Sequence, residues 1–247
     1  MISAERQTPR VALVTGGTRG IGAAVSRALR DAGRRVVATY TARRDEARAF
    51  ESATGIRTMA FDVGDFAACE DALARIAAED GPVTILVNNA GITRDSTIGK
   101  MTRAAWDAVI DTNLGAAFNL CRLTMPAMRT EGFGRIINMA SINGQTGQFG
   151  QANYAASKAG LQGLTRALAL EGARHNITVN TLAPGYIDTA MLDTVPPQIL
   201  ADIVGRIPVG RLGTADEVAR CVTFLTAEES GFITGSTLSV NGGQHMA

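Results

Sequence analysis

A run of glycines between an apolar segment and an amphipathic one constrains the fold of this chain more than any other feature. The run, TGGTRGIG at residues 15–22, directly follows the apolar segment VALVT at residues 11–15. Gly16 permits a tight turn, Gly20 permits close approach of a ligand, and Gly22 permits close packing of helix on strand. Backbone N–H groups and the helix dipole at such a turn hold a pyrophosphate. The run therefore predicts a dinucleotide-binding strand–turn–helix unit, the alternative being a glycine turn without a ligand.

Short apolar runs alternate with longer helical patterns along the rest of the chain, as in repeated βα units around a parallel sheet. The expected strands cover residues 11–15, 35–40, 57–61, 84–87, 135–141, 177–182 and 237–240. The expected helices cover residues 21–32, 45–52, 66–78, 102–128, 153–174, 196–204 and 214–226. No Ser/Gly-rich linker divides them, so we expect residues 1–247 to form a single α/β domain with a Rossmann-type, doubly wound parallel sheet and helices on both faces.

Prolines punctuate the segment after the sixth expected strand. Pro184 ends that strand, and Pro196 and Pro197 precede the next helix. Loops at the carboxyl ends of strands carry binding residues, so residues 186–212 are interpreted as a substrate lid. A rigid turn is the alternative.

The composition excludes several classes of protein. Hydrophobic residues (46%) and charged residues (19%) suit a globular core, and 24 Lys+Arg against 23 Asp+Glu leave no basic excess for nucleic acid. Three separated cysteines and two histidines predict neither a disulfide framework nor a metal site. The N-terminal segment has no apolar core, and no stretch is long enough to span a membrane, so we expect a cytoplasmic protein.

The choice of cofactor is indicated about 20 residues after the glycine turn, where an acidic residue would bind the ribose 2′-hydroxyl of NAD. Residues 39–42 contain no acid, whereas Arg43 and Arg44 follow directly and Arg19 lies within the glycine turn. These cations favour an additional 2′-phosphate, so we expect NADP(H). The alternative is that the arginine pair is surface charge at the start of a helix.

Tyr154 and Lys158 lie four residues apart at the start of an expected helix, which places them on one face. An ammonium beside a phenol, together with a cationic nicotinamide, favours the phenolate and lowers the tyrosine pKa, so the pair suits an acid and the group that tunes it. Ser141, at the end of an expected strand, is positioned to bind a substrate carbonyl. Taken singly, Tyr154 suits a half-buried anchor, Lys158 a surface charge and Ser141 a helix cap or turn residue. Their combination with the glycine turn favours catalysis.

Together these motifs resemble the short-chain dehydrogenase/reductase family over essentially the whole chain. The motifs are TGGTRGIG, NNAG at 88–91, Asn113, Ser141, YAASK at 154–158 and PG at 184–185. The resemblance implies that Tyr154 is the catalytic acid and that Ser141 polarises the carbonyl. It also implies that Lys158 binds the nicotinamide ribose and lowers the tyrosine pKa, and that Asn113 supports a water in a proton relay.

The expected cofactor-binding residues come from the glycine turn, the basic residues after the second strand, and the family resemblance. They are Gly16, Thr18, Arg19, Gly20, Ile21, Gly22, Thr41, Arg43, Arg44, Asp62, Val63, Asn89, Ala90, Gly91, Ile92, Tyr154, Lys158, Pro184, Gly185, Ile187 and Thr189.

Within the family, residues 141–154, 91–95 and 239–246 are similar to those of members that reduce acetoacetyl-CoA for polyhydroxybutyrate synthesis. This implies NADPH-dependent formation of (R)-3-hydroxybutyryl-CoA. Phe149 and Tyr186 are expected to form an apolar wall beside the acyl chain, with the glutamines on thioester or amide groups. The expected substrate contacts are Asp95, Ser141, Gln148, Phe149, Gln151, Tyr154 and Tyr186.

The nearest alternative substrate is a 3-oxoacyl thioester of acyl carrier protein, since reductases of fatty acid synthesis share the same catalytic motifs. Glu131 favours CoA, because it puts a carboxylate where an acidic carrier protein would need a basic surface. A non-catalytic NADP-binding regulator is a remote alternative. The resemblance also implies a homotetramer formed through residues 102–128 and 153–174 and the C-terminal segment, with burial inside the monomer as the competing interpretation of the same apolar faces.

Overall fold

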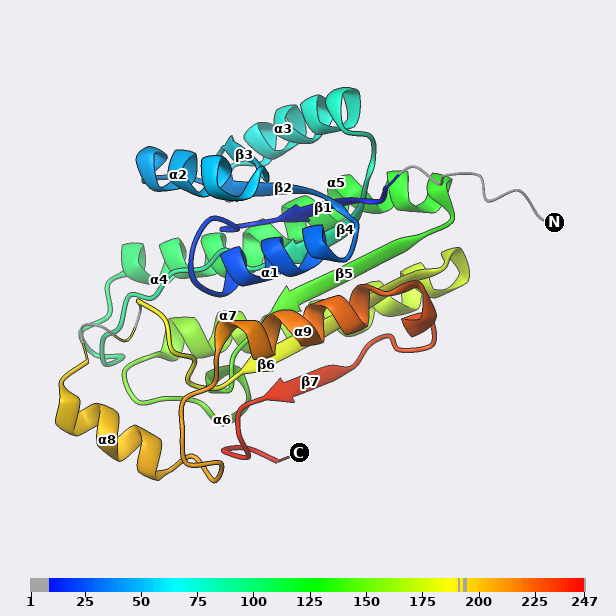
Figure 1. Ribbon diagram of the computed structural model, residues 1–247. Helices are drawn as coiled ribbons and strands as arrows, with labels where there is room; N and C mark the ends of the chain where they lie inside the picture. Colours follow the sequence, from blue (N-terminus) through cyan, green and yellow to red (C-terminus); the bar gives the residue numbers. More distant parts are fainter. Residues whose placement is uncertain (1–8, 191, 193–194, 247) are drawn as a thin grey trace.

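The central strands of the structure are buried at every residue, in keeping with their largely apolar sequences. The computed structural model describes residues 9–190, 192 and 195–246. Its strands are β1 (Val11–Val14), β2 (Arg35–Tyr40), β3 (Arg57–Ala60), β4 (Val83–Asn88), β5 (Gly134–Met139), β6 (Ile177–Pro184) and β7 (Thr237–Val240). They form one seven-stranded sheet in the order β3-β2-β1-β4-β5-β6-β7, with every neighbouring pair parallel (Figure 1).

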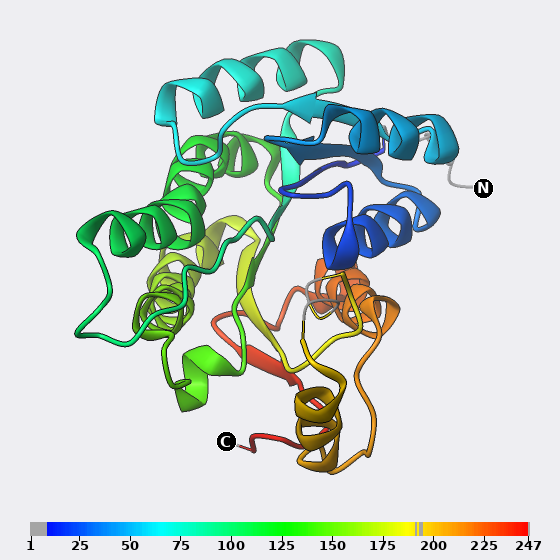
Figure 2. The same cartoon turned by 90° about the vertical axis from the view of Figure 1, so that its left-hand side faces the viewer.

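Helices connect the strands and cover both faces of the sheet. They are α1 (Gly20–Asp31), α2 (Arg44–Thr54), α3 (Phe66–Glu79), α4 (Arg103–Ile110), the π-helical turn η1 (Asp111–Gly115), α5 (Ala116–Glu131), α6 (Asn143–Thr146), α7 (Ala152–Gly172), η2 (Ala173–His175), α8 (Pro197–Gly205), α9 (Ala215–Thr226) and η3 (Glu228–Ser230). In Figure 2, α1, α2 and α9 lie to the right of the sheet, and α3, α5 and α7 lie to the left. The expected doubly wound α/β fold is confirmed.

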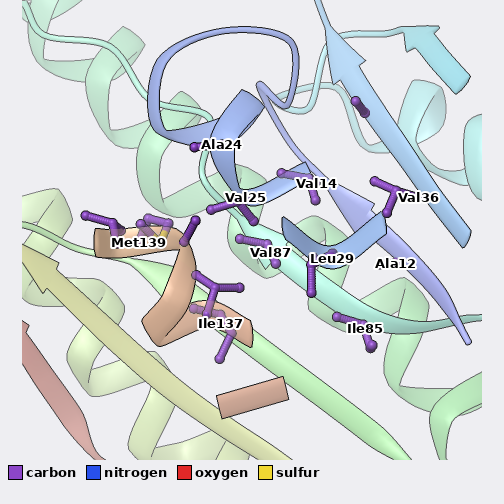
Figure 3. Close-up of a cluster of buried hydrophobic side chains, with 14 of the residues drawn as sticks. Ala12, Val14, Ala24, Val25, Leu29, Val36, Ile85, Val87, Ile137 and Met139 are labelled. Atoms are coloured by element: carbon purple, nitrogen blue, oxygen red, sulfur yellow. The ribbon is translucent and has the colours of Figure 1, made fainter. Parts of the chain in front are cut away.

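Two apolar cores hold these layers together, one on each face. On one face Val25 and Leu29 of α1 are directed at the sheet beside Val87 of β4, as Figure 3 shows. On the other face Leu120 and Met128 of α5 are fully buried. Burying an aliphatic side chain contributes about 1.5–3 kcal/mol, so these cores fix the sheet whose carboxyl ends carry the site.

Several expected boundaries are wrong, and the differences fall near the candidate site. The expected helix 102–128 consists of α4, η1 and α5 and continues to Glu131, because the π turn interrupts the helical hydrogen-bond pattern. The strand expected at 135–141 ends at Met139, where the chain turns into α6, a helix that was not expected. The sixth strand continues to Pro184 because β7 pairs with it through that residue.

The two ends of the expected lid (residues 186–212) are joined by a short parallel bridge between Ile187 and Gly213. Asp188 N donates to Gly213 O at 2.8 Å, and Gly213 N donates to Tyr186 O at 3.0 Å. Residues 191, 193 and 194 of this segment lie outside the described residues, as do residues 1–8 and 247 of the chain. Within the described ranges, no helix is long and apolar enough to cross a membrane.

Candidate active site

The glycine turn lies at the carboxyl end of β1, beside the point where the strand order reverses between β1 and β4. Gly16 and Gly20 have φ values of 59° and 51°, a left-handed conformation that favours glycine. Thr39 Oγ1 accepts a 3.2 Å hydrogen bond from Gly16 N, which ties the turn to β2. The turn therefore presents the N-terminus of α1 to the crevice, as a pyrophosphate site requires.

The glycine that allows the turn to pack closely against the strands is not the one expected. A Cβ atom on Gly22 would overlap the carbonyl oxygen of Gly16, so Gly22 packs against the turn itself. A Cβ atom on Gly17 would lie 2.8 Å from Ala38 Cβ and 2.7 Å from Val14 O. Gly17, which was not among the expected residues, therefore provides the close approach between the turn and the strands.

Thr15 and Asn89 join the ends of β1 and β4. Thr15 Oγ1 accepts hydrogen bonds of 2.9 Å from the backbone N–H groups of Asn89 and Ala90. Asn89 Nδ2 in turn donates to Thr15 O at 2.9 Å. Thr15 was missed in the sequence analysis, although its place directly before the glycines was a usable signal. These hydrogen bonds fix the end of β1 against the segment that follows β4.

The π turn η1 places Asn113 in the site. Its Oδ1 accepts a 2.8 Å hydrogen bond from Ile92 N, and its Nδ2 donates to Ile92 O at 3.0 Å and to Ser157 Oγ at 3.1 Å. A Cβ atom on Gly91 would lie 3.2 Å from Asn113 Oδ1 and 3.4 Å from Lys158 Nζ. Asn113, Gly91 and Lys158 therefore meet at one point, as expected for a shared site.

Tyr154 and Lys158 lie on α7 as the spacing predicts, with Lys158 Nζ 5.5 Å from the centroid of the tyrosine ring. Lys158 is 4% exposed and donates from Nζ to Met139 O at 2.7 Å. Desolvation by burial lowers the Lys158 pKa to about 8. The ammonium is therefore held in a low-dielectric position between β5 and the phenol.

Burial is the largest influence on the pKa of Tyr154 in this structure. Desolvation raises the pKa of Tyr154 above its usual value, and the charge of Asp95 raises it further. A hydrogen bond with Ser141 opposes these effects without reversing them. The loss of water around the phenol is the largest of these effects. The lowering of the pKa expected from Lys158 together with a cationic nicotinamide stays a prediction.

The expected substrate residues divide into two groups. Gln151 Nε2 donates to Asp95 Oδ2 at 2.7 Å, which joins these two residues at the edge of the site. Phe149 is 89% exposed, and Tyr186 is half-buried beside the base of the lid. The apolar wall expected of Phe149 and Tyr186 beside an acyl chain therefore stays a prediction. Gln148 is also exposed.

The cations expected near the cofactor are all exposed and lie after β1 and β2. Arg19 is the N-cap of α1 and makes no capping hydrogen bond with its side chain. Arg43 precedes α2 with a left-handed φ of 62° and forms a 2.8 Å ion pair with Glu46. Arg44 begins α2. A left-handed arginine is strained, and such strain is found most often at binding sites.

The other residues expected to bind the cofactor lie after β3 and at the start of the expected lid. Asp62 Oδ1 accepts from Gly64 N at 2.9 Å, whereas the Val63 side chain is buried in the core, so Val63 presents backbone only. A Cβ atom on Gly20 would lie 3.8 Å from the methyl group of Thr189, which places Thr189 beside the glycine turn. Left-handed glycines, an α1 N-terminus and flanking cations are the features that a nicotinamide dinucleotide needs, so the residues fit this cofactor.

Comparisons with known proteins agree with this geometry. The family model described as enoyl-(acyl carrier protein) reductase matches residues 16–245. Acetoacetyl-CoA reductase of Rhizobium meliloti (strain 1021) is 56% identical over 239 residues, 96% of this chain and 99% of the relative. Acetoacetyl-CoA reductase of Cupriavidus necator is 48% identical over 244 residues, 97% and 99% of the two chains. The 3-oxoacyl-[acyl-carrier-protein] reductase of Escherichia coli (strain K12) is 45% identical over 239 residues, 96% and 98% of the two chains. The match of the family model and the identity to the relatives over nearly the full length, together with the parallel sheet, show that this chain belongs to the short-chain dehydrogenase/reductase family.

Proposed function

We propose that this enzyme reduces acetoacetyl-CoA to (R)-3-hydroxybutyryl-CoA with NADPH, in the cytoplasm, for polyhydroxybutyrate synthesis. The observation that carries the proposal is the Ser141–Tyr154–Lys158 cluster beside the glycine turn, in a chain 56% identical to an acetoacetyl-CoA reductase. Ketone reduction needs an acid at the carbonyl oxygen, and this cluster supplies one.

The residues divide the reaction among them. The nicotinamide cofactor, when bound, supplies the hydride that adds to C3 of the substrate. Ser141 holds the carbonyl oxygen, and Tyr154 donates its hydroxyl proton to that oxygen as the hydride adds. The raised pKa of Tyr154 keeps the phenol protonated before this step. Lys158, anchored by Met139 O, stabilises the phenolate that forms.

The preference for NADPH is supported by the charges around the crevice. Arg19, Arg43 and Arg44 are exposed at the ends of β1 and β2, and residues 39–42 include no carboxylate to bind a free ribose 2′-hydroxyl. A 2′-phosphate forms charge-assisted hydrogen bonds with arginine. Dissociation constants for NADPH and NADH, measured by protein fluorescence, test this part of the proposal, and equal values would reject it.

The substrate is tested by comparing kcat/KM for acetoacetyl-CoA and acetoacetyl-acyl carrier protein under identical conditions. A preference of tenfold, about 1.4 kcal/mol, for acetoacetyl-CoA supports the proposal. The reverse preference assigns the enzyme to fatty acid synthesis. This second function is favoured by the 45% identity to the Escherichia coli 3-oxoacyl-[acyl-carrier-protein] reductase.

We also propose that the enzyme is a homotetramer. Phe118 of α5 and Leu170 of α7 are exposed on one side of the sheet. Phe224, Phe232 and Leu238 are exposed near β7, which is an edge strand of the sheet. Exposed apolar groups and an open edge strand favour association. Light scattering after size-exclusion chromatography tests the assembly, and a monomer would reject it.

A further inference from the structure

A chain of hydrogen bonds runs along the substrate side of the site and links residues that are far apart in the sequence. Gln151 Nε2 donates to Asp95 Oδ2 at 2.7 Å, and Asn143 Nδ2 donates to Gln151 Oε1 at 2.9 Å. The backbone N–H of Asn143 donates to Ser141 Oγ at 3.2 Å. Asn143, the first residue of α6, thus contacts both the expected carbonyl-binding serine and an expected substrate-binding glutamine.

The direction of this chain follows from the chemistry of its ends. An ionised carboxylate only accepts hydrogen bonds, so the amide nitrogen of Gln151 must face Asp95. The amide oxygen of Gln151 must then face Asn143, whose side-chain nitrogen donates to it. A glutamine held from both sides cannot turn its amide over. One hydrogen of Nε2 is used by Asp95, and the other is left to donate.

Backbone contacts also join the segments that carry these side chains. Ser96 and Gln151 form a parallel bridge, and Ser96 N donates to Gly150 O at 2.8 Å. Helix α6 is packed directly on α7, because a Cβ atom on Gly144 would lie 2.8 Å from Lys158 Cβ. The Asn143–Gln151 contact is therefore held in register with the helix that carries Tyr154 and Lys158.

We propose that Asp95 and Asn143 are positioning residues that lock the Gln151 amide, so that its second N–H donates to the thioester carbonyl of the substrate. This inference rests on the proposed function, and it changes the part expected of Asp95. A carboxylate cannot donate to a carbonyl oxygen. Asp95 therefore acts through Gln151 and does not bind the thioester itself.

A double-mutant cycle tests the proposal. Asp95→Ala, Asn143→Ala and Gln151→Ala are each compared with the wild type, and the first two are repeated in the Gln151→Ala background. We expect each single variant to raise KM for acetoacetyl-CoA about tenfold with kcat changed less than about threefold, as for loss of one ground-state hydrogen bond. In the Gln151→Ala background, neither further change has an effect on KM. If Asp95→Ala or Asn143→Ala raises KM by the same factor in the Gln151→Ala background as in the wild type, the proposal is overturned.

Two further variants separate positioning from charge and from surface effects. Asp95→Asn keeps an oxygen that can accept from Gln151 Nε2, so it restores KM towards the wild-type value relative to Asp95→Ala. An Asp95→Asn variant no better than Asp95→Ala would contradict the proposal. Asp71→Ala removes an exposed carboxylate from α3 and is the matched control for KM. Melting temperatures of all variants identify any loss of folding.

The wild-type enzyme in the same assay distinguishes this inference from the proposed function. Turnover of acetoacetyl-CoA with independent effects in the cycle rejects the positioning role alone. Turnover of the carrier-protein thioester alone rejects the CoA proposal, and the cycle is then run with that substrate, which presents the same thioester. Failure to turn over either thioester rejects both.

Discussion

Lys158 Nζ lies 2.7 Å from the carbonyl oxygen of Met139, so the cation facing Tyr154 is fixed to the last residue of β5. The same position is almost inaccessible to water, and this burial lowers the Lys158 pKa to about 8. Holding this cation beside the phenol therefore lowers the stability of the folded state, because a buried charge is desolvated.

Replacing Lys158 with methionine is expected to change how the free energy of unfolding depends on pH. Unfolded Lys158 binds its proton up to a pKa near 10.5, whereas folded Lys158 releases it near 8. Between these values the unfolded state binds more protons, so the stability of the wild type rises with pH, by about 1.4 kcal/mol per unit of pKa difference. The free energy of unfolding of Lys158→Met does not show this rise with pH. Urea unfolding of both proteins from below pH 8 to above pH 10 measures the difference, and parallel pH curves would contradict it.

Tyr154→Phe removes the acid and leaves the ring in place. We expect kcat to fall about 10²–10⁴-fold while the dissociation constant of NADPH is unchanged. Steady-state kinetics and fluorescence titration measure the two quantities. Undiminished reductase activity would reject the catalytic assignment and leave the chain as an NADP-binding regulator.

Asp95→Asn is expected to move the pH profile of kcat. The loop before α4 carries Arg94, Asp95 and Lys100, of which Asp95 raises the Tyr154 pKa. Lys158 faces Tyr154 from α7, and the Ser141 hydroxyl faces it after β5. Removing the Asp95 charge lowers the Tyr154 pKa, because one of the two effects that raise it is lost. Reduction requires the protonated phenol, so the alkaline fall in kcat shifts to lower pH. An unchanged alkaline limb would show that Asp95 does not act on Tyr154.

Arg43→Ala and Arg44→Ala are expected to weaken NADPH binding selectively. A charge-assisted hydrogen bond is worth about 1.5–3 kcal/mol, so we expect the NADPH dissociation constant to rise about 10–100-fold and that of NADH to change little. Arg48→Ala, on the exposed surface of the same helix, is the control. Equal effects on both cofactors would remove these arginines from 2′-phosphate recognition.

Arg135 is expected to be essential for stability and dispensable for chemistry. It is 1% exposed on β5. Its guanidinium donates to the carbonyl oxygens of Gly134, Asn176, Ala227 and Glu228. Arg135→Ala leaves these acceptors buried, so we expect a loss of about 3–5 kcal/mol in the free energy of unfolding with kcat retained. Urea unfolding measures this loss, and Arg174→Ala, at an exposed position, is the control. A loss equal to that of the control would refute the argument.

The sheet and the glycine turn were predictable because their signals are local. Apolar runs and helical spacing specify βα units, and glycine at positions 16 and 20 permits the left-handed backbone found there. The four-residue spacing of Tyr154 and Lys158 likewise required only a helix. The π turn around Asn113 was not predictable, because its extra residue is stabilised by hydrogen bonds with Ile92 and Ser157 on other segments.

Local sequence patterns were sufficient to predict the alternation of strands and helices and the position of the glycine turn. They also placed Tyr154 and Lys158 on one helix. Tertiary structure decided the electrostatics and the hydrogen-bond partners. The pKa of Tyr154 is raised mainly because burial removes water from the phenol. Asn143 contacts Gln151, which contacts Asp95, only because the fold brings these three segments together. Desolvation and long-range hydrogen bonds depend on which segments the fold brings together, and periodicity along one chain does not contain that information.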